Sequence, residues 1–239
     1  MKTIKLFTLA LFSIAFFQAP FVIANQSSPG KQTRDVHGFH GVSVSTGIDL
    51  YLSQKNVEEV VVEAEADDMD KIITEVEGGI LKIYVKEKSF FNLNWNKHAR
   101  KVYVSFKNLD RIDASAGSDV SSQSTLKLDN LKMYSSSGSD IRLEVEANEL
   151  SAESSSGSDI SLKGKADVLH ADASSGSDIK AGDFQVKKCS ASSSSGSDVR
   201  VFVTEELEAN ASSGGDVTYS GNPAKKDINE SSGGDVHSR

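Results

Sequence analysis

The sequence is short of several residue types, and each shortage excludes a class of structure or function. Its 239 residues include one cysteine, Cys189, so no disulfide can form within the chain. Lysine and arginine number 26 against 34 acidic residues, which gives a net charge of −8. An acidic protein of this kind is poorly suited to binding nucleic acid or anionic lipid. Packing must therefore carry the fold, and we expect no nucleic acid partner.

The sequence also lacks the short motifs that mark common active sites. It contains no G-x-S-x-G, H-E-x-x-H or C-x-x-C, and its five histidines are scattered. We therefore expect a protein that is not an enzyme and that needs no cofactor. Parallel β-helices do host polysaccharide-cleaving enzymes, so a lyase or hydrolase acting on carbohydrate stays open as an alternative.

Long apolar runs are confined to the N-terminus. Lys2 and Lys5 precede a mainly apolar run over 6–17, and small residues follow, as in a secretory signal peptide over 1–24. The run is too short to span a bilayer as a helix, so we expect no transmembrane segment in the mature chain. Its removal takes away two lysines and no acid, which moves the net charge from −8 to −10. We expect an exported protein, periplasmic, outer-surface or extracellular, in which residues 25–34 form a flexible tail.

What the sequence has in abundance is one repeated segment, Ser-Ser-Gly-Ser-Asp-Ile, complete at Ser136–Ile141. It returns every 18 to 21 residues in seven copies that differ slightly. The glycines of these copies, to which we assign a structural role in the turn, are Gly117, Gly138, Gly157, Gly176, Gly196, Gly214 and Gly233. A nearly constant period of this length is typical of a solenoid, in which each turn buries its apolar side against its neighbours.

Apolar residues recur at fixed distances from each glycine. Five and seven residues before it, and three after it, the positions are mostly Leu, Ile, Val, Met or Ala. Alternate positions on a strand share one face, so these columns predict an inward wall, and each turn reads as strand, glycine corner, strand and variable return. The sequence thus predicts an all-β, single-domain, right-handed parallel β-helix over 35–239, with about 19–20 residues per turn over 111–239 and irregular turns over 35–110. A sandwich of antiparallel hairpins is the structural alternative.

An aspartate two residues after each glycine forms the most conspicuous polar column. Its members are Asp119, Asp140, Asp159, Asp178, Asp198, Asp216 and Asp235. Stacked turns would bring neighbouring carboxylates ~4.8 Å apart, where they repel by ~0.9 kcal/mol at the dielectric of water. Solvated turn residues are the first interpretation. A calcium-binding face, which would make the protein a stiffened structural rod, is the alternative, because carboxylate oxygens suit that ion.

The least repetitive part of the chain is the stretch 89–100. It contains Phe90, Phe91 and Trp95, which we take as candidates for ligand binding, because aromatic side chains on an irregular segment can stack on sugars or anchor a partner. The alternative is that these side chains cap an open end of the β-helix. Glu230 stands where other turns place Ser or Ala on the inward wall. A charge there protects the last strand from pairing with another chain, which favours a monomer.

The segment Gly-Phe-His-Gly-Val-Ser-Val, Gly38 to Val44, leads to Gly47-Ile48-Asp49, a degenerate copy of the later corners. Together with the Ser-Gly-Ser-Asp corners it resembles the bacterial head GIN domain family over nearly the whole mature chain. Asp49 stands where the family's namesake asparagine would be. The resemblance implies a right-handed β-helix and the adhesin-like role of an auto-transporter adhesin. We therefore expect a non-enzymatic envelope module that presents a repetitive Ser/Asp face for binding a glycan, a cell-surface protein or another surface.

Overall fold

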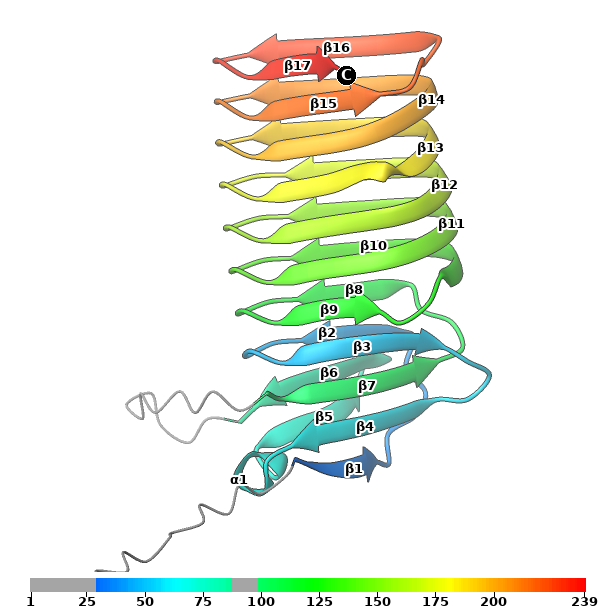
Figure 1. Ribbon diagram of the computed structural model, residues 1–239, viewed down its shortest axis with the longest axis vertical. Coiled ribbons are helices and arrows are strands. Elements are labelled where there is room, and N and C mark those ends of the chain that lie inside the picture. Colours follow the sequence, from blue (N-terminus) through cyan, green and yellow to red (C-terminus); the bar gives the residue numbers. More distant parts are fainter. Residues whose placement is uncertain (1–28, 87–98) are drawn as a thin grey trace, which may run out of the picture.

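Seventeen strands and one short helix make up the part of the chain that the structure describes, residues 29–86 and 99–239. The structure is a computed structural model, shown in Figure 1. The expected signal peptide and the aromatic residues Phe90, Phe91 and Trp95 lie outside the described residues. All seventeen strands join one continuous sheet, which coils along the long axis of the molecule.

The strands fall into an irregular N-terminal group and a regular C-terminal group. The first group and its helix are β1 (Gly30–Arg34), β2 (Gly41–Val44), β3 (Asp49–Gln54), β4 (Glu59–Ala64), α1 (Ala66–Met69), β5 (Ile72–Glu77), β6 (Ile80–Val85) and β7 (Lys101–Phe106). The second group is β8 (Arg111–Ala114), β9 (Asp119–Ser122), β10 (Leu126–Ser135), β11 (Asp140–Ser154), β12 (Asp159–Ala173), β13 (Asp178–Ser194), β14 (Asp198–Ser212), β15 (Asp216–Ser220), β16 (Lys225–Ser231) and β17 (Asp235–Ser238). Within the described residues, no helix has the length and apolar character that a bilayer crossing requires.

Strands β8 to β17 form a parallel β-solenoid, as the repeat predicts. Each corner aspartate pairs with the aspartate of the next turn, for example Asp140 with Asp159 and Asp159 with Asp178. In Figure 1 the nearer strands run to the right and the fainter strands return to the left behind them while the chain climbs, which makes the coil right-handed. A sandwich of antiparallel hairpins is thereby excluded for this region.

Each turn has one sharp corner, at the glycine, and one wide bend on the opposite edge. The strands β11 to β14 run for 15 to 17 residues from one corner to the next without interruption. The variable return is therefore itself strand. It stays extended because most of its residues pair with the turns on either side, and shifts of register absorb the differences in length.

The predicted apolar columns form the core. The column three residues after the glycine has an exposed fraction of 0% from Val120 through to Val217, and Leu150 and Leu169 of another column are equally buried. At the last turn Ile228 occupies an inward column but is 41% exposed, because it lies on the outermost strand of the coil. Burial of a side chain of this size contributes about 1.5–3 kcal/mol, so the stacking of turns stabilises the fold without a covalent link.

The N-terminal group continues the coil and then covers its end. Strands β2 and β3 stack in parallel on β8 and β9, with Asp49 opposite Asp119, so the stretch around Gly47 is a further turn of the same kind. Strands β6 and β7 stack in parallel on β2 and β3. Then β4 pairs antiparallel with β7 and β1, and β5 pairs antiparallel with β6. The predicted irregular N-terminal turns are thus a mixed sheet.

Strand β1 corrects the predicted N-terminal tail. The polar composition predicts a flexible segment over 25–34, but Gly30–Arg34 forms a strand that pairs residue by residue with β4, ending with Arg34 opposite Val60. Arg34 also donates a hydrogen bond to the carbonyl oxygen of Met69 at 2.7 Å. The prediction fails here because an edge strand needs only backbone partners, and its side chains can remain polar and in solvent.

The last turn ends in a charged edge strand. All seven residues of β16, Lys225–Ser231, are exposed. The carboxylate of Glu230 accepts a hydrogen bond from the Val236 N–H at 2.7 Å, which ties the two strands of the last turn together. A charged strand of this kind resists pairing with another sheet edge. It supports the expectation of a monomer, which stays a prediction.

Candidate functional site

Each corner of the solenoid places two successive residues in the left-handed backbone region. At the seven corner glycines φ lies between +68° and +74°, and at the serine or alanine before each it lies between +49° and +57°. A Cβ at Gly157 would meet no atom within 4 Å, so the requirement for glycine there comes from the backbone angle and not from crowding. The corner glycines therefore have the structural role that the repeat predicts, which is to let the chain reverse direction.

The serine after the corner glycine joins neighbouring turns. The buried Ser158 Oγ lies 2.8 Å from the carbonyl oxygen of Ser135 in the previous turn and 2.7 Å from that of Ser155 in its own corner. It also accepts a hydrogen bond from the Ser155 N–H at 3.2 Å. The same contacts recur at Ser139, Ser177 and Ser197. Their hydroxyl groups are satisfied inside the protein and serve cohesion between turns.

The predicted aspartate column lies on the outer surface, directly after the corners, and runs in register from turn to turn. We call it the corner stripe, together with the serine column that stands two residues before each corner glycine: Ser115, Ser136, Ser155, Ser174, Ser194, Ser212 and Ser231. The eighth member of the aspartate column is Asp49, which pairs with Asp119. Partial burial and the charge of Asp119 raise the pKa of Asp49. Burial of the carboxyl group is the larger cause of the raised pKa, and the like charge stacked on the neighbouring strand adds to it.

Basic side chains from the same strands neutralise part of the corner stripe. Lys180 Nζ lies 2.6 Å from a carboxylate oxygen of Asp159 and 3.2 Å from one of Asp178. The hydrogen bond to Asp159 raises the pKa of Lys180, which keeps the ammonium group charged. Arg142 bridges Asp119 and Asp140 in the same way. At these positions the protein supplies the positive charge that the calcium hypothesis assigns to a bound ion.

The C-terminal end of the corner stripe differs from the rest. Ligand atoms of Asp216, Asp235 and His237 lie within 4.8 Å of one another. Two carboxylates and an imidazole are groups that can share a divalent cation. No other group of three such residues occurs among residues 29–86 and 99–239. The remaining members of the predicted metal column are therefore spread along the coil and do not converge on one point.

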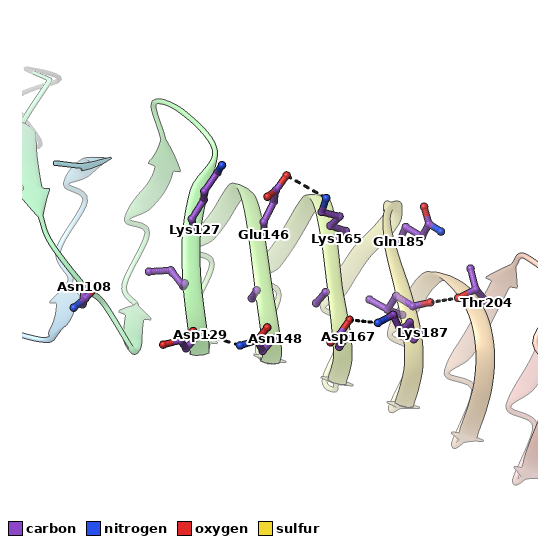
Figure 2. A pocket seen from close by; sticks show the side chains of 14 residues that line it. Asn108, Lys127, Asp129, Glu146, Asn148, Lys165, Asp167, Gln185, Lys187 and Thr204 are labelled. Atoms are coloured by element: carbon purple, nitrogen blue, oxygen red, sulfur yellow. Dashed lines mark hydrogen bonds and ion pairs between the residues drawn. The ribbon is translucent and has the colours of Figure 1, made fainter.

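The bend edge of the solenoid carries a groove of about 530 Å³, which lies further from the corner glycines than the columns used in the sequence analysis. Figure 2 shows it crossing the strands from β10 to β14. Its floor consists of Leu128, Ala147, Ala166 and Val186, which pair in register across four turns. We call this the bend groove. Its volume lies in the range of small-molecule sites, roughly 300–1,000 Å³.

Two rows of polar side chains border the floor of the bend groove. One row is Lys127, Glu146, Lys165 and Gln185, and the other is Asp129, Asn148, Asp167 and Lys187. Lys165 Nζ lies 3.6 Å from Glu146, and Lys187 Nζ lies 2.7 Å from Asp167. Asn148 donates a hydrogen bond to Asp129 at 3.3 Å. Three lysines and three acids thus balance one another, and the rims carry no net charge.

The rim residues can be aligned from the sequence, because each row stands at a constant distance before the next corner glycine. The first row precedes it by 11 residues (Lys127, Glu146, Lys165 and Gln185), and the second row precedes it by 9 residues (Asp129, Asn148, Asp167 and Lys187). The strand pairing places Lys127 opposite Glu146, Glu146 opposite Lys165 and Lys165 opposite Gln185. The columns used in the sequence analysis reach back only seven residues from each glycine, and nothing in the spacing shows that the positions further back border a groove.

The other residues singled out in the sequence lie away from the bend groove or outside the described residues. Cys189 is buried in the core, and burial raises the pKa of its thiol to about 12, so the thiol is inert. The aromatic candidates Phe90, Phe91 and Trp95 belong to the segment 87–98, which the structure does not describe. Their role in ligand binding stays a prediction.

Comparison with models of known protein families identifies one that matches most of the chain. Residues 38–223 match the model of a family described as "Putative auto-transporter adhesin, head GIN domain". The chain belongs to the head GIN domain family. This confirms the resemblance inferred from the segment before Gly47 and from the Ser-Gly-Ser-Asp corners. No curated protein matches the chain.

Several solved structures share the fold of this head GIN domain. A "putative adhesin" from Bacteroides fragilis is 18% identical, with a TM-score of 0.80 over 89% of this chain and 98% of that one. A "putative adhesin" from Parabacteroides merdae is 15% identical, with a TM-score of 0.69 over 90% and 97%. A "Putative lipid binding protein" from Parabacteroides distasonis is 21% identical, with a TM-score of 0.66 over 90% and 98%. At such identities the likeness establishes a common fold and leaves the ligand open.

Proposed function

We propose that this head GIN domain is the binding part of an exported, non-enzymatic adhesin that attaches to a surface through the outer side chains of the coil. Membership of a family of auto-transporter adhesins supports an exported or cell-surface protein. The observation that carries the proposal is that polar side chains repeat in straight columns on stacked turns. Such repetition suits many weak contacts made at once with an extended surface.

The corner stripe offers one surface for such contacts. Its aspartates alternate with Arg142, Lys180 and Arg200, so that donors and acceptors both face outward. The serine hydroxyls beside them add further polar groups. This is the Ser/Asp face that the repeat leads us to expect, and its part in binding is a proposal.

Cleavage of carbohydrate has less support than binding. Glycosidases use two carboxyl groups that flank one bond, one of them free to act as an acid. In the bend groove Asp129 accepts a hydrogen bond from Asn148, Glu146 pairs with Lys165, and Asp167 pairs with Lys187. The hydrogen bond from Lys187 to Asp167 raises the pKa of the lysine, which makes it a poor proton acceptor near neutral pH.

Binding to surfaces tests the proposal directly. The purified protein, fluorescently labelled, would be applied to glycan arrays, extracellular matrix proteins and intact bacterial and host cells. We expect saturable binding to at least one of these surfaces, and no release of sugar from polysaccharides incubated with the protein. Absence of saturable binding to every surface would contradict the adhesin proposal, whereas release of reducing ends would favour the enzyme.

A further inference from the structure

We propose that the bend groove binds an uncharged linear glycan, which lies along the axis of the solenoid. The inference rests on the proposed function, because it names the site and the class of ligand that the adhesin would use. Three kinds of observation support it: the shape of the groove, the charge of its rims, and the direction of the strands that cross it.

The shape of the groove calls for an elongated ligand. The floor crosses four turns, which stand ~4.8 Å apart, so its first and last residues are separated by ~14 Å. Asn108 and Thr204 extend the lining at the two ends. The middle of the floor is formed by the small side chains of Ala147 and Ala166, which leave room for the face of a ring. A chain of linked rings along the axis would fit such a floor.

The charge of the rims selects against polyelectrolytes. A uronic acid polymer or sulfated glycan would meet Asp129, Glu146 and Asp167, and a polycation would meet the lysines of the same rims. Four of the six charges form two ion pairs, and the six charges sum to zero, so neither type of ligand gains a net attraction. A hydroxyl group both donates and accepts hydrogen bonds, so a row of mixed amides, carboxylates and ammonium groups can serve a neutral sugar at each turn.

The direction of the strands argues against a peptide as the occupant. An extended peptide normally binds by adding to the free edge of a sheet. Here the strands cross the groove, and the pairing of Lys127, Glu146 and Lys165 in successive turns already uses the backbone groups between them. A peptide helix would need an apolar groove, but both rims are polar. A glycan needs neither a free edge nor an apolar groove.

Asn148 is the position at which the groove can be blocked with the least harm to the fold. It is exposed, it donates a hydrogen bond to Asp129, and the pairing of its neighbours aligns it with Asp167 of the next turn. Figure 2 shows it in the row between these two acids. In Asn148→Arg the new guanidinium group would be held between two carboxylates while its bulk fills the groove.

A matched control exists on the last turns. Asn229 is likewise exposed and donates a hydrogen bond to a residue one turn earlier, Asn210, at 3.2 Å. It does not line the bend groove. Asn229→Arg therefore adds the same charge and bulk elsewhere. A second variant, Asp216→Arg, changes the corner stripe between Asp198 and Asp235 and tests that surface as the rival site.

The experiment measures the dissociation constants of wild type and the three variants by calorimetry. The probes are linear neutral glucan, mannan and xylan oligosaccharides of increasing length, with polygalacturonate, heparin and polylysine as charged comparisons. We expect the wild type to bind a neutral series, with affinity that rises with length until the groove is filled and that is insensitive to salt. Asn148→Arg should weaken this binding at least about tenfold, or about 1.4 kcal/mol, and its control Asn229→Arg should bind the same oligosaccharides as wild type does.

Each of the other outcomes contradicts one part of the proposal: the site, the class of ligand or the function. Binding to a surface that survives Asn148→Arg refutes the groove while the adhesin proposal stands, and its loss in Asp216→Arg assigns contact to the corner stripe. Wild-type binding to charged probes alone refutes the ligand class. No wild-type binding to any surface or probe refutes the proposed function as well. If Asn148→Arg lowers the urea midpoint of unfolding, Asn148→Ala with Asn229→Ala as its control makes the same test, because removal of the amide also weakens binding.

Discussion

The two long edges of the solenoid differ in how strongly their sequence repeats from turn to turn. At the corner edge nearly the same six residues recur in every turn, and buried hydroxyls such as that of Ser158 bond to the backbone of two turns. At the bend edge the residues differ from turn to turn, and their polar side chains border a groove. Repetition in the sequence thus marks the edge that holds the turns together. Variation marks the edge that is available for a ligand.

The physical reason lies in what each edge demands of the chain. The corner needs two successive residues at positive φ followed by a small residue in a buried place, and few residue types meet these conditions. The bend is a continuous strand, which accepts most side chains on its outer face. Outer-face residues of the bend can therefore change to suit a ligand while the solenoid stays folded.

The largest expected effect tests whether the bend is as permissive as this contrast implies. Gly164 lies in the bend region of β12 with φ +115°, and a Cβ there would lie 2.2 Å from the carbonyl oxygen of Val145. We expect Gly164→Ala to lower the free energy of unfolding by about 3 kcal/mol, because both the backbone angle and the contact are unfavourable. Urea denaturation followed by circular dichroism measures it.

Gly182 provides the control, since a Cβ there would meet no atom within 4 Å and its φ lies outside the left-handed region. Gly182→Ala should leave the urea midpoint nearly unchanged. Equal stability of the two alanine variants would mean that the bend tolerates any residue. Only the corner edge would then require particular residue types.

The next effect concerns the buried hydroxyls of the corner edge. Ser158→Val replaces the hydroxyl group with two methyl groups, which adds volume in a buried place and leaves the carbonyl oxygens of Ser135 and Ser155 without this partner. We expect a loss of about 2 kcal/mol in the free energy of unfolding, because buried polar groups without partners are costly. The measurement is again the urea midpoint. Ser158→Gly should cost less, since Gly215 and Gly234 occupy the same place in the last two turns. A valine variant as stable as wild type would show that the buried corner serines do not hold neighbouring turns together.

A smaller effect is expected at the corner glycine itself. Gly157 has φ +69° and free space around it, so alanine there meets only the strain of the left-handed backbone. Gly157→Ala should lower the free energy of unfolding by about 1 kcal/mol. Thermal unfolding of this variant beside Gly164→Ala separates strain alone from strain with a clash. A larger loss at Gly157 than at Gly164 would reverse the order that the contact predicts.

The smallest effect belongs to the charges of the corner stripe. Lys180→Met should change the free energy of unfolding by at most about 0.5 kcal/mol at neutral pH, because exposed ion pairs contribute little. The sign of its pH dependence is fixed by the raised pKa of Lys180. Its contribution is fully present below the ordinary value of 10.5 and disappears as the pH rises through the higher value in the folded state. Unfolding free energies of both proteins at neutral and strongly alkaline pH should therefore converge at the alkaline end.

The same variant sharpens the question of calcium. Removal of Lys180 leaves the carboxylates of Asp159 and Asp178 without this shared cation. If calcium can replace it, the melting temperature of Lys180→Met should rise in calcium more than that of wild type, by mass action on the folded state. Identical melting in calcium and in chelator for both proteins would count against a metal-binding stripe.

The sequence by itself determined the turn of this protein: its length near twenty residues, its glycine corner, the inward columns such as that of Val120, and the aspartate column beside the corner. These are local or strictly periodic properties, and each copy of the repeat carries the residues that produce them. The tertiary structure alone decided that the bend is hollowed into a groove, that Gly30–Arg34 forms a strand, and that Lys180 pairs with two aspartates. These features depend on how segments that are apart in the sequence lie against one another, such as β1 against β4 and Lys180 against Asp159, and no local or periodic property of the chain specifies such contacts.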